Sequence, residues 1–480
     1  MQGSFIGCPH HSKWPMVDHL PFAAYCQRPI REPVERLDME RGTPARQRRT
    51  DTGRRVPGKV TTAAVLGTVL EWYDFAIYGA MAGVIGRLFF PSDDPTVSLL
   101  VSLASYAVGF VCRPLGAILL GRLGDRAGRR SMLALTMVIV GVSSLLIGLL
   151  PTYASVGLLA PALLVALRML QGLAVGAEWT GGATYLIEHA RTGRRGLFSG
   201  IVQASTVAGF LLGTGIATVI VRVVPEQTVD AWGWRVPFLV GGVVAAVGLF
   251  VRLKLDESPA YRALGEEEVR SRQMSTNDVP ATDNEGRTTT RRNWLLVLGI
   301  VFGVTLYGYT ATSFPTFLTG VDALPLADAL MTNVVALLIE VPLIIAAGVL
   351  SDRVGRKKLM TGAMALFALG TYPVFALVAS GTIAGALLGQ VVFVVLFATV
   401  SGPMAAMFVE LFPTRVRSAA FSSSYNIGVA VFGGTAPFVN TFLATSTGVD
   451  VAPAFYLTFG ALISLVFLSR VRDGHDQELR

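Results

Sequence analysis

Two carboxylates stand three residues apart in the middle of a long apolar segment. Glu71 and Asp74 lie within an apolar run that covers residues 61–89, and positions i and i+3 of a helix share one face. Because two neighbouring carboxylates cannot both ionise cheaply, one of them could carry a proton. The alternative is that one of them simply pairs with an arginine. The spacing therefore predicts a proton-coupling site, with Asp74 as the favoured carrier.

Other ionisable side chains also lie inside apolar segments, where each costs about 2.5–3.5 kcal/mol or more and is therefore a candidate for function. Arg113 could bind a substrate carboxylate through two parallel hydrogen bonds, or it could form a structural pair with Glu178 or Asp74. Glu178 could relay a proton as a third coupling residue, or it could neutralise Arg113. Glu340 could be a second protonation site or a protonated structural group.

Uncharged side chains in the same segments could complete a substrate site together with Arg113. Aromatic and amide groups in membrane segments also serve helix packing. Both interpretations stay open for four residues, namely Tyr106, Gln203, Tyr307 and Tyr309. Arg168 and Gln171 share a helix face and are interpreted as polar residues of helix packing.

A charged loop motif occurs twice, about half a chain apart. It reads G-x-x-x-D-R-x-G-R-[RK], first over residues 121–130 and again over residues 348–357. Each copy lies between two long apolar segments. Two copies in the same setting indicate a duplicated helix bundle, which is how many transporters are built.

A second duplicated element supports the first. The pattern Glu-x6-Arg links Glu188 to Arg195 and Glu410 to Arg417. We interpret both elements as a charge network that holds the two halves together in one state and breaks in another; the alternative is that the charges only set topology. The predicted gating residues are Gly121, Asp125, Arg126, Arg129, Glu188, Arg195, Gly348, Asp352, Arg353, Arg356, Glu410 and Arg417.

The elements that must position these residues are membrane helices. Of the 480 residues, 52% are hydrophobic and only 15% are charged, against roughly 25% charged residues in soluble proteins. Apolar runs long enough to cross a bilayer recur along the chain, and they lack the polar faces that a large soluble bundle needs. Twelve spans are predicted, at 61–89, 97–120, 132–150, 156–187, 197–221, 234–253, 294–318, 328–350, 359–379, 383–409, 418–442 and 451–470.

The remaining segments are polar. Residues 1–57 are rich in Arg and Pro and are expected to be a disordered tail, with Met39 as a candidate true start. The predicted organisation continues with a first six-helix bundle over 58–253, a charged linker over 254–293, a second bundle over 294–470 and a tail over 471–480.

The positive charges lie mostly in loops on one side of the predicted bundle. The net charge is +8, but Lys and Arg follow the even-numbered spans, which is the positive-inside pattern and not a nucleic-acid surface. Both termini are therefore expected in the cytoplasm. The three cysteines suggest no disulfide framework. Cys8 and three histidines of the tail are not expected to bind a metal, and the G-x-x-x-x-G-K run over 53–59 lacks the Ser/Thr and the strand of a phosphate loop.

Together these motifs resemble the major facilitator superfamily, and more narrowly its metabolite:proton symporter family, over residues 60–470. The runs that carry the resemblance are Glu71–Phe75, Arg113–Gly116, Gly176–Trp179, Trp232–Arg235, Glu410–Arg415 and Gly433–Pro437. The resemblance implies two six-helix halves around a central cavity. Members of this family carry citrate, α-ketoglutarate, shikimate or proline and betaine.

The sequence thus predicts a monomeric secondary transporter of the plasma membrane, an all-α membrane protein that works by alternating access. It is expected to carry a small organic acid or zwitterion in symport with protons, with no cofactor besides the coupling proton. The alternatives are an exporter or antiporter, and a membrane sensor that binds solute without moving it. An enzyme is not predicted, because no nucleophile–base set, metal cluster or phosphate loop is found.

Overall fold

The computed structural model describes residues 58–117, 119, 129–176, 178–255, 284–321, 324–414, 416–477 and 479. For residues 58–60, 62–64, 129–133, 251–255 and 284–286 only the backbone is described. The regular elements in this part of the chain are all helices. Most of the first copy of the repeated motif, including Gly121, Asp125 and Arg126, and the side chain of Arg129 lie outside the description, as do the predicted tail over 1–57 and most of the predicted linker.

The described helices fall into two sets, which we call the first half (residues 58–255) and the second half (residues 284–477). The first half contains α1 (Gly58–Ala80), α2 (Ala82–Phe89), α3 (Pro95–Val111), α5 (Arg129–Leu149), α6 (Tyr153–Val156), α7 (Leu159–Val175), α8 (Glu178–Glu188), α9 (Arg195–Val223), α10 (Glu226–Thr228), the π-helix η1 (Val229–Gly233) and α11 (Arg235–Leu255). The second half contains α13 (Asn284–Gly320), α14 (Leu326–Val354), α15 (Arg356–Val378), α16 (Ile383–Leu411), α17 (Arg417–Gly428), the π-helix η2 (Val429–Gly433), α18 (Ala436–Thr447) and α19 (Ala452–Ser469).

Each predicted span coincides with one helix or with two or three consecutive helices. Within the described residues, nine helices are long and apolar enough to cross a membrane, and the bent pair Glu226–Gly233 and Arg235–Phe250 gives a tenth. The other two spans are α1, which carries the two carboxylates, and α5, whose apolar part is the shorter stretch Ala134–Leu149. One boundary differs, because α13 starts at Asn284, inside the predicted linker. Apolarity marks where a helix enters a membrane and not where it begins.

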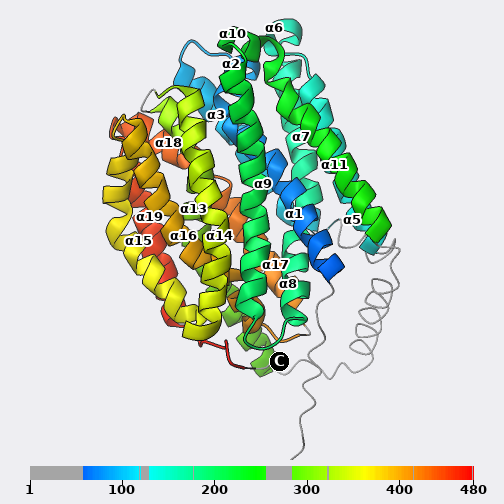
Figure 1. Ribbon diagram of the computed structural model, residues 1–480, viewed down its shortest axis with the longest axis vertical. Coiled ribbons are helices and arrows are strands. Elements are labelled where there is room, and N and C mark those ends of the chain that lie inside the picture. Colours follow the sequence, from blue (N-terminus) through cyan, green and yellow to red (C-terminus); the bar gives the residue numbers. More distant parts are fainter. Residues whose placement is uncertain are drawn as a thin grey trace, which may run out of the picture. The chain divides into compact units, whose positions relative to one another are not determined.

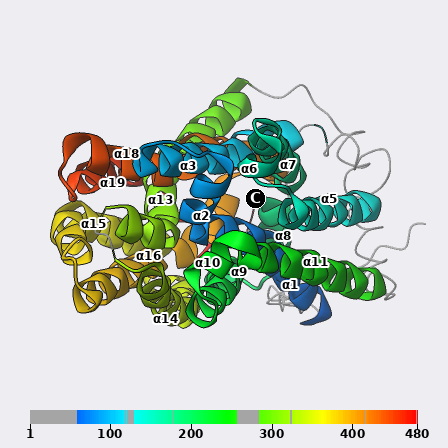
Figure 2. The same cartoon turned by 90° about the horizontal axis from the view of Figure 1, so that it is seen from above.

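The two halves lie side by side. Seen from above, the helices of the first half gather on one side and those of the second half on the other (Figure 2). The long helices run roughly parallel between two ends, with α2 and α10 at one end and the start of α9 near the C-terminus at the other (Figure 1). Between the halves, α9 packs along α14 and α1 meets α13. The functional site should therefore be sought where these helices face one another.

Local signals explain several helix ends. The side chain of Asp94 accepts a hydrogen bond from the backbone N–H of Thr96 at 2.8 Å, with Pro95 as the first residue of α3, which is a favourable N-terminal cap. Between α14 and α15 the backbone of Gly355 has a φ of +101°. Since residues with a side chain rarely adopt this conformation, a glycine is required at this sharp turn.

Small residues bring α9 and α14 into close contact. A methyl group added to Gly196 would overlap the carbonyl oxygen of Gly348, and one added to Gly348 would overlap that of Gly196. One helical turn further along α9, a methyl group on Gly200 would lie 2.9 Å from the carbonyl oxygen of Ile344. Such contacts let helix backbones approach closely in membrane proteins, so the two halves touch backbone to backbone here.

Candidate functional site

Asp74 lies at the centre of a buried polar cluster in the first half. Its carboxylate is 3.5 Å from the Arg168 guanidinium and accepts a hydrogen bond of 2.5 Å from the amide of Gln171. Both partners are almost fully buried, and the Arg168 guanidinium lies 3.8 Å from the centre of the Tyr78 ring. The interpretation of Arg168 and Gln171 as packing residues is therefore incomplete, because both contact the favoured proton carrier.

Glu71 faces a different cation. Its carboxylate lies 3.8 Å from Arg113, a pair that the sequence did not predict. The Arg113 guanidinium also packs against Trp72, Phe75 and Phe110, with 4.8, 4.7 and 4.5 Å to the ring centres. These aromatic contacts stabilise the buried cation. The two carboxylates of α1 thus belong to separate pairs.

The three predicted coupling residues line one cavity inside the first half. Glu71, Asp74 and Glu178 all border this space of about 440 Å³, which we call the side cavity. Its other walls come from α5, α7 and α11, and the hydroxyl of Thr136 on α5 lies 3.5 Å from a carboxylate oxygen of Glu178. The three acids come from two helices, α1 and α8, and border one space.

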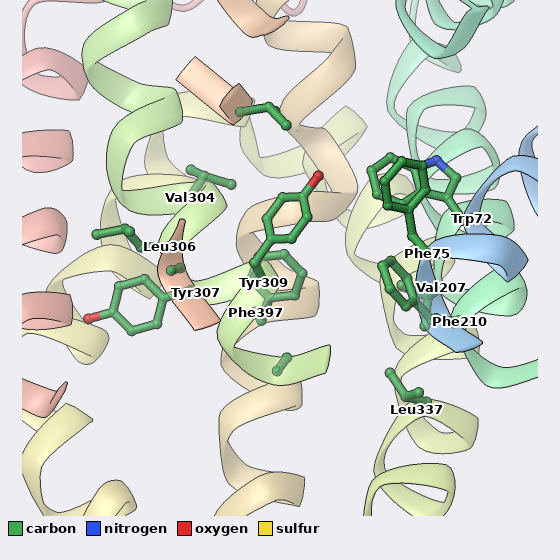
Figure 3. Packing of buried hydrophobic residues seen from close by; sticks show 14 of the residues in the cluster. Trp72, Phe75, Val207, Phe210, Val304, Leu306, Tyr307, Tyr309, Leu337 and Phe397 are labelled. Atoms are coloured by element: carbon green, nitrogen blue, oxygen red, sulfur yellow. The ribbon is translucent and has the colours of Figure 1, made fainter. Parts of the chain in front are cut away.

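A second space lies between the halves. This central cavity of about 520 Å³ is bordered by α1 and α9 from the first half and by α13, α14, α16 and α17 from the second. Of the predicted substrate-binding residues, it includes Gln203 and Tyr309. Arg113 lies one side chain away from it, behind Trp72, which borders the cavity. Figure 3 shows Trp72 and Phe210 of the first half facing Tyr309 and Phe397 of the second.

The other two predicted binding residues lie elsewhere. Tyr106 borders a smaller space of about 280 Å³ together with Phe75 and Phe210. Tyr307 points away from the central cavity (Figure 3); its hydroxyl is hydrogen-bonded to that of Thr371 at 2.7 Å and its ring stacks on Phe367. Tyr307 therefore makes packing contacts within the second half and does not line the central cavity.

The lining of the central cavity is rich in buried polar atoms that have no hydrogen-bond partner among the described residues. They are Trp72 Nε1, Gln203 Oε1, Thr206 Oγ1, the Tyr309 hydroxyl and both carboxylate oxygens of Glu340. Unsatisfied buried polar groups are rare in folded proteins and call for an explanation. A ligand that brings its own donors and acceptors would satisfy them.

At one end of the bundle, the duplicated Glu-x6-Arg elements exchange partners between the halves. Glu188 of the first half pairs with Arg417 of the second at 2.5 Å, and Glu410 of the second half pairs with Arg195 of the first at 3.4 Å. We call these two contacts the crossed ion pairs. Arg195 and Arg417 are nearly fully buried, so the pairs are little screened by solvent.

The second copy of the loop motif extends this network. Arg356 lies 3.0 Å from Glu410 and 3.1 Å from Asp352. Asp352 accepts hydrogen bonds from the backbone N–H groups of Gly196 and Leu197, at 2.8 and 3.0 Å. These N–H groups form the start of α9, where a carboxylate is favoured by the helix dipole. The network therefore ties the second half to the first half through charge and through backbone.

The remaining predicted gating residues have different surroundings. Arg353 is exposed, and Gly348 makes the close contact with Gly196 described above. At the opposite end of the bundle the halves also touch, through an ion pair of 2.8 Å between Arg222 and Asp328 and a hydrogen bond of 2.8 Å from the Thr316 hydroxyl to the Gly79 carbonyl. Contacts between the halves are therefore present at both ends of the bundle.

Comparison with known proteins places these features in a family. The chain matches the family described as sugar (and other) transporter over residues 59–472. It is 34% identical to the proline/betaine transporter of Salmonella typhimurium, over 85% of this chain and 82% of the relative. It is 35% identical to the glycine betaine/proline/ectoine/pipecolic acid transporter OusA of Dickeya dadantii over the same shares. It is 33% identical to the inner membrane metabolite transport protein YhjE of Escherichia coli, over 88% of this chain and 95% of the relative.

Solved structures match the fold. A crystal structure of a D-xylose-proton symporter aligns with a TM-score of 0.69 at 20% identity, over 88% of this chain and 99% of the other. An inward-open structure of the xylose transporter XylE from E. coli aligns with a TM-score of 0.68 at 19% identity, over 86% of this chain and 96% of the other. These matches confirm the predicted twelve-span fold. Among the described residues, no group of three or more His, Cys, Asp or Glu side chains could hold a metal ion.

Proposed function

This chain belongs to the sugar (and other) transporter family, within the major facilitator superfamily, and on that premise we propose that it is a secondary transporter that carries a small zwitterion or organic acid in symport with protons. The observation that carries the proposal is the presence of two spaces, one bordered by three carboxylates within the first half and the other lying between the halves. Solute and proton would then use neighbouring but separate sites.

The proton site in this proposal is Asp74. A buried carboxylate that pairs with a buried guanidinium and an amide is well held when ionised, and its protonation removes the attraction to Arg168. Protonation thus changes the balance of charge where α1 meets α7. Glu71 and Glu178 border the same cavity and are proposed to pass the proton on.

The solute site is the central cavity. Buried polar groups that have no hydrogen-bond partner among the described residues line it. Both halves line it, so a bound solute contacts both and can influence how they move. The relatives that are named as transporters of proline, betaine or ectoine support a zwitterion over a simple organic acid.

Alternating access would be governed by the crossed ion pairs. In the present arrangement Glu188–Arg417 and Glu410–Arg195 hold one end of the bundle closed. Rocking of the halves would break these pairs and open the central cavity at that end. Because both pairs have partners on different halves, neither can persist in the open state.

We propose that the end with the crossed ion pairs faces the cytoplasm of a cell whose plasma membrane holds the protein. The Arg- and Lys-containing loops after the even-numbered spans support this orientation, and the C-terminal segment lies at the same end, where the backbone carbonyl of Gln477 accepts a hydrogen bond from Arg195 at 2.7 Å. Each chain encloses its own cavity, which supports a functional monomer.

Uptake into proteoliposomes tests the proposal. The purified protein would be given labelled zwitterions and organic acids under an inwardly directed proton gradient, with and without an uncoupler. The expected result is accumulation of at least one compound that collapses when the uncoupler is added. Accumulation that ignores the uncoupler would contradict proton coupling. Uptake of no compound by correctly inserted protein would favour the exporter or sensor alternatives.

A further inference from the structure

The central cavity contains one buried carboxyl group with no partner among the described residues. Glu340 is 1% exposed and lies on α14, and it borders the cavity. Neither of its oxygens has a hydrogen-bond partner, and no Lys, Arg or His in the described part of the chain forms an ion pair with it. An isolated buried carboxylate is too costly to keep unless something satisfies it. The acids of the side cavity differ, because each has a polar partner.

Aromatic rings line the same cavity as this carboxylate. Five of the residues that line the central cavity are aromatic: Trp72, Phe210, Tyr309, Phe397 and Tyr425. They come from both halves, and the close-up shows Trp72 and Phe210 opposite Tyr309 and Phe397 (Figure 3). The face of an aromatic ring attracts cations, and groups of such rings bind alkylated ammonium ions. Among the lining residues, Glu340 is also the single charged one.

We propose that Glu340 binds the positively charged nitrogen of the transported solute, so that the central cavity selects zwitterions with an alkylated ammonium group and rejects plain organic anions. The inference rests on the proposed function in one respect, that the solute enters this cavity. A plain carboxylate would meet the negative charge of Glu340 with no cation in the lining to balance it.

The other end of such a solute also finds suitable groups. Its carboxylate needs hydrogen-bond donors, and the indole N–H of Trp72 and the Tyr309 hydroxyl are both buried and unpartnered. Arg113 lies directly behind Trp72 and adds a positive potential on that side. The cavity thus presents a negative group on α14 and donors on α1 and α13, which orients a dipolar solute across the interface between the halves.

Pairs of solutes that differ only in the charged nitrogen test this assignment. Glycine betaine would be compared with 3,3-dimethylbutyrate, in which carbon replaces the nitrogen, and proline with cyclopentanecarboxylate. Equilibrium binding to the purified protein in detergent requires no proton gradient. We expect the wild-type protein to bind the zwitterion of at least one pair roughly 30-fold more tightly than its anionic analogue. The Glu340→Gln variant should reduce that ratio to about threefold or less, chiefly by losing affinity for the zwitterion.

Two further variants keep the test decisive. Glu226→Gln removes an exposed acid near the opposite end and should leave the ratio unchanged. Phe397→Leu keeps every charge and removes one ring face, so it should weaken glycine betaine binding by about 3- to 10-fold; it decides the case if Glu340→Gln does not fold.

The results that would overturn the assignment are distinct from those that would overturn the proposed function. Equal binding of anion and zwitterion by the wild-type protein, binding of neither zwitterion, or an unchanged ratio in Glu340→Gln would refute it. So would a Glu340→Gln protein that binds zwitterions normally but loses uncoupler-sensitive accumulation, because Glu340 would then be a proton site. Selective binding without any uncoupler-sensitive accumulation by the wild-type protein would support the binding role and contradict proton symport.

Discussion

The carboxylate of Glu188 lies 2.5 Å from the guanidinium of Arg417, although 229 residues separate them in the chain. Each belongs to a Glu-x6-Arg element, and each pairs with the corresponding element of the other half. This exchange of partners makes the pair a contact between the halves and not a support within either one. We therefore expect its strength to affect how readily that end of the bundle opens.

Breaking one member of this pair should favour the open state. In Glu188→Gln the buried Arg417 loses the carboxylate charge of Glu188 in the closed state, whereas in the open state it could meet water. We expect an increase of roughly tenfold in the thiol-labelling rate of a Ser199→Cys reporter in a background free of other cysteines. Ser199 is fully buried and accepts a hydrogen bond from the Ala406 N–H across the halves. Adding Arg417→Gln should reverse part of the effect, with a coupling of about 0.5–3 kcal/mol.

The exposed acid Glu226 at the opposite end provides the control for that experiment. Its carboxylate is 3.8 Å from Arg87 and both belong to the first half. The Glu226→Gln variant should therefore label at the wild-type rate. Equal labelling of Glu188→Gln and the wild-type protein would mean that the crossed ion pairs do not control opening.

Like the Glu188–Arg417 pair, the contact between Gly196 and Gly348 should stabilise the closed state and not the open state. A methyl group on Gly196 overlaps the backbone of α14, and overpacking of this kind costs about 1–3 kcal/mol. Gly196→Ala should therefore raise labelling of the same reporter. Gly215→Ala is the matched control, because it lies on the same helix with nothing within 4 Å of the added methyl group. A Gly196→Ala protein that labels like Gly215→Ala would show that backbone contact is not needed for closure.

Tyr307 and Tyr309 offer a paired test on one helix. The Tyr309 hydroxyl faces the central cavity unpartnered, so Tyr309→Phe should raise the KM for solute by about 2- to 10-fold with little change in melting temperature. The Tyr307 hydroxyl bonds to Thr371 instead, so Tyr307→Phe should lower the melting temperature and leave KM unchanged. Opposite results for the two variants would place the solute on the other side of α13.

The helices were predictable from the sequence, whereas their contacts were not. Apolar runs of membrane-spanning length are visible without any tertiary information, so all twelve spans were found. The partners of Asp74 were missed because Arg168 and Gln171 lie in an apolar segment with no polar face, and nothing in such a segment tells which way a side chain points. The one available signal was that all three lie well inside their spans.

The crossed ion pairs were predictable in part. Equal spacing in Glu188–Arg195 and Glu410–Arg417 predicted a duplicated network, but spacing alone allows each pair to close within its own half. Each acid pairs with the arginine of the other half because the two halves face each other at this end, and the sequence does not show that arrangement. Glu340 shows the same limit. The sequence reveals an isolated acid in a span, but it does not reveal the aromatic residues of five other helices that line the same cavity.

Asp74 should be the residue whose neutralisation separates proton coupling from solute movement. In Asp74→Asn the side chain keeps its size and can still accept a hydrogen bond from Gln171, but it can no longer bind and release a proton. We therefore expect uncoupler-sensitive accumulation to be lost while exchange of labelled for unlabelled solute across proteoliposomes continues, since exchange needs no net proton movement. An unchanged melting temperature would show that the fold is retained. The Asp94→Asn variant, at the exposed cap of α3, serves as control and should accumulate solute normally. Full accumulation by Asp74→Asn would remove Asp74 from the coupling mechanism and leave Glu71 or Glu178 as the carrier.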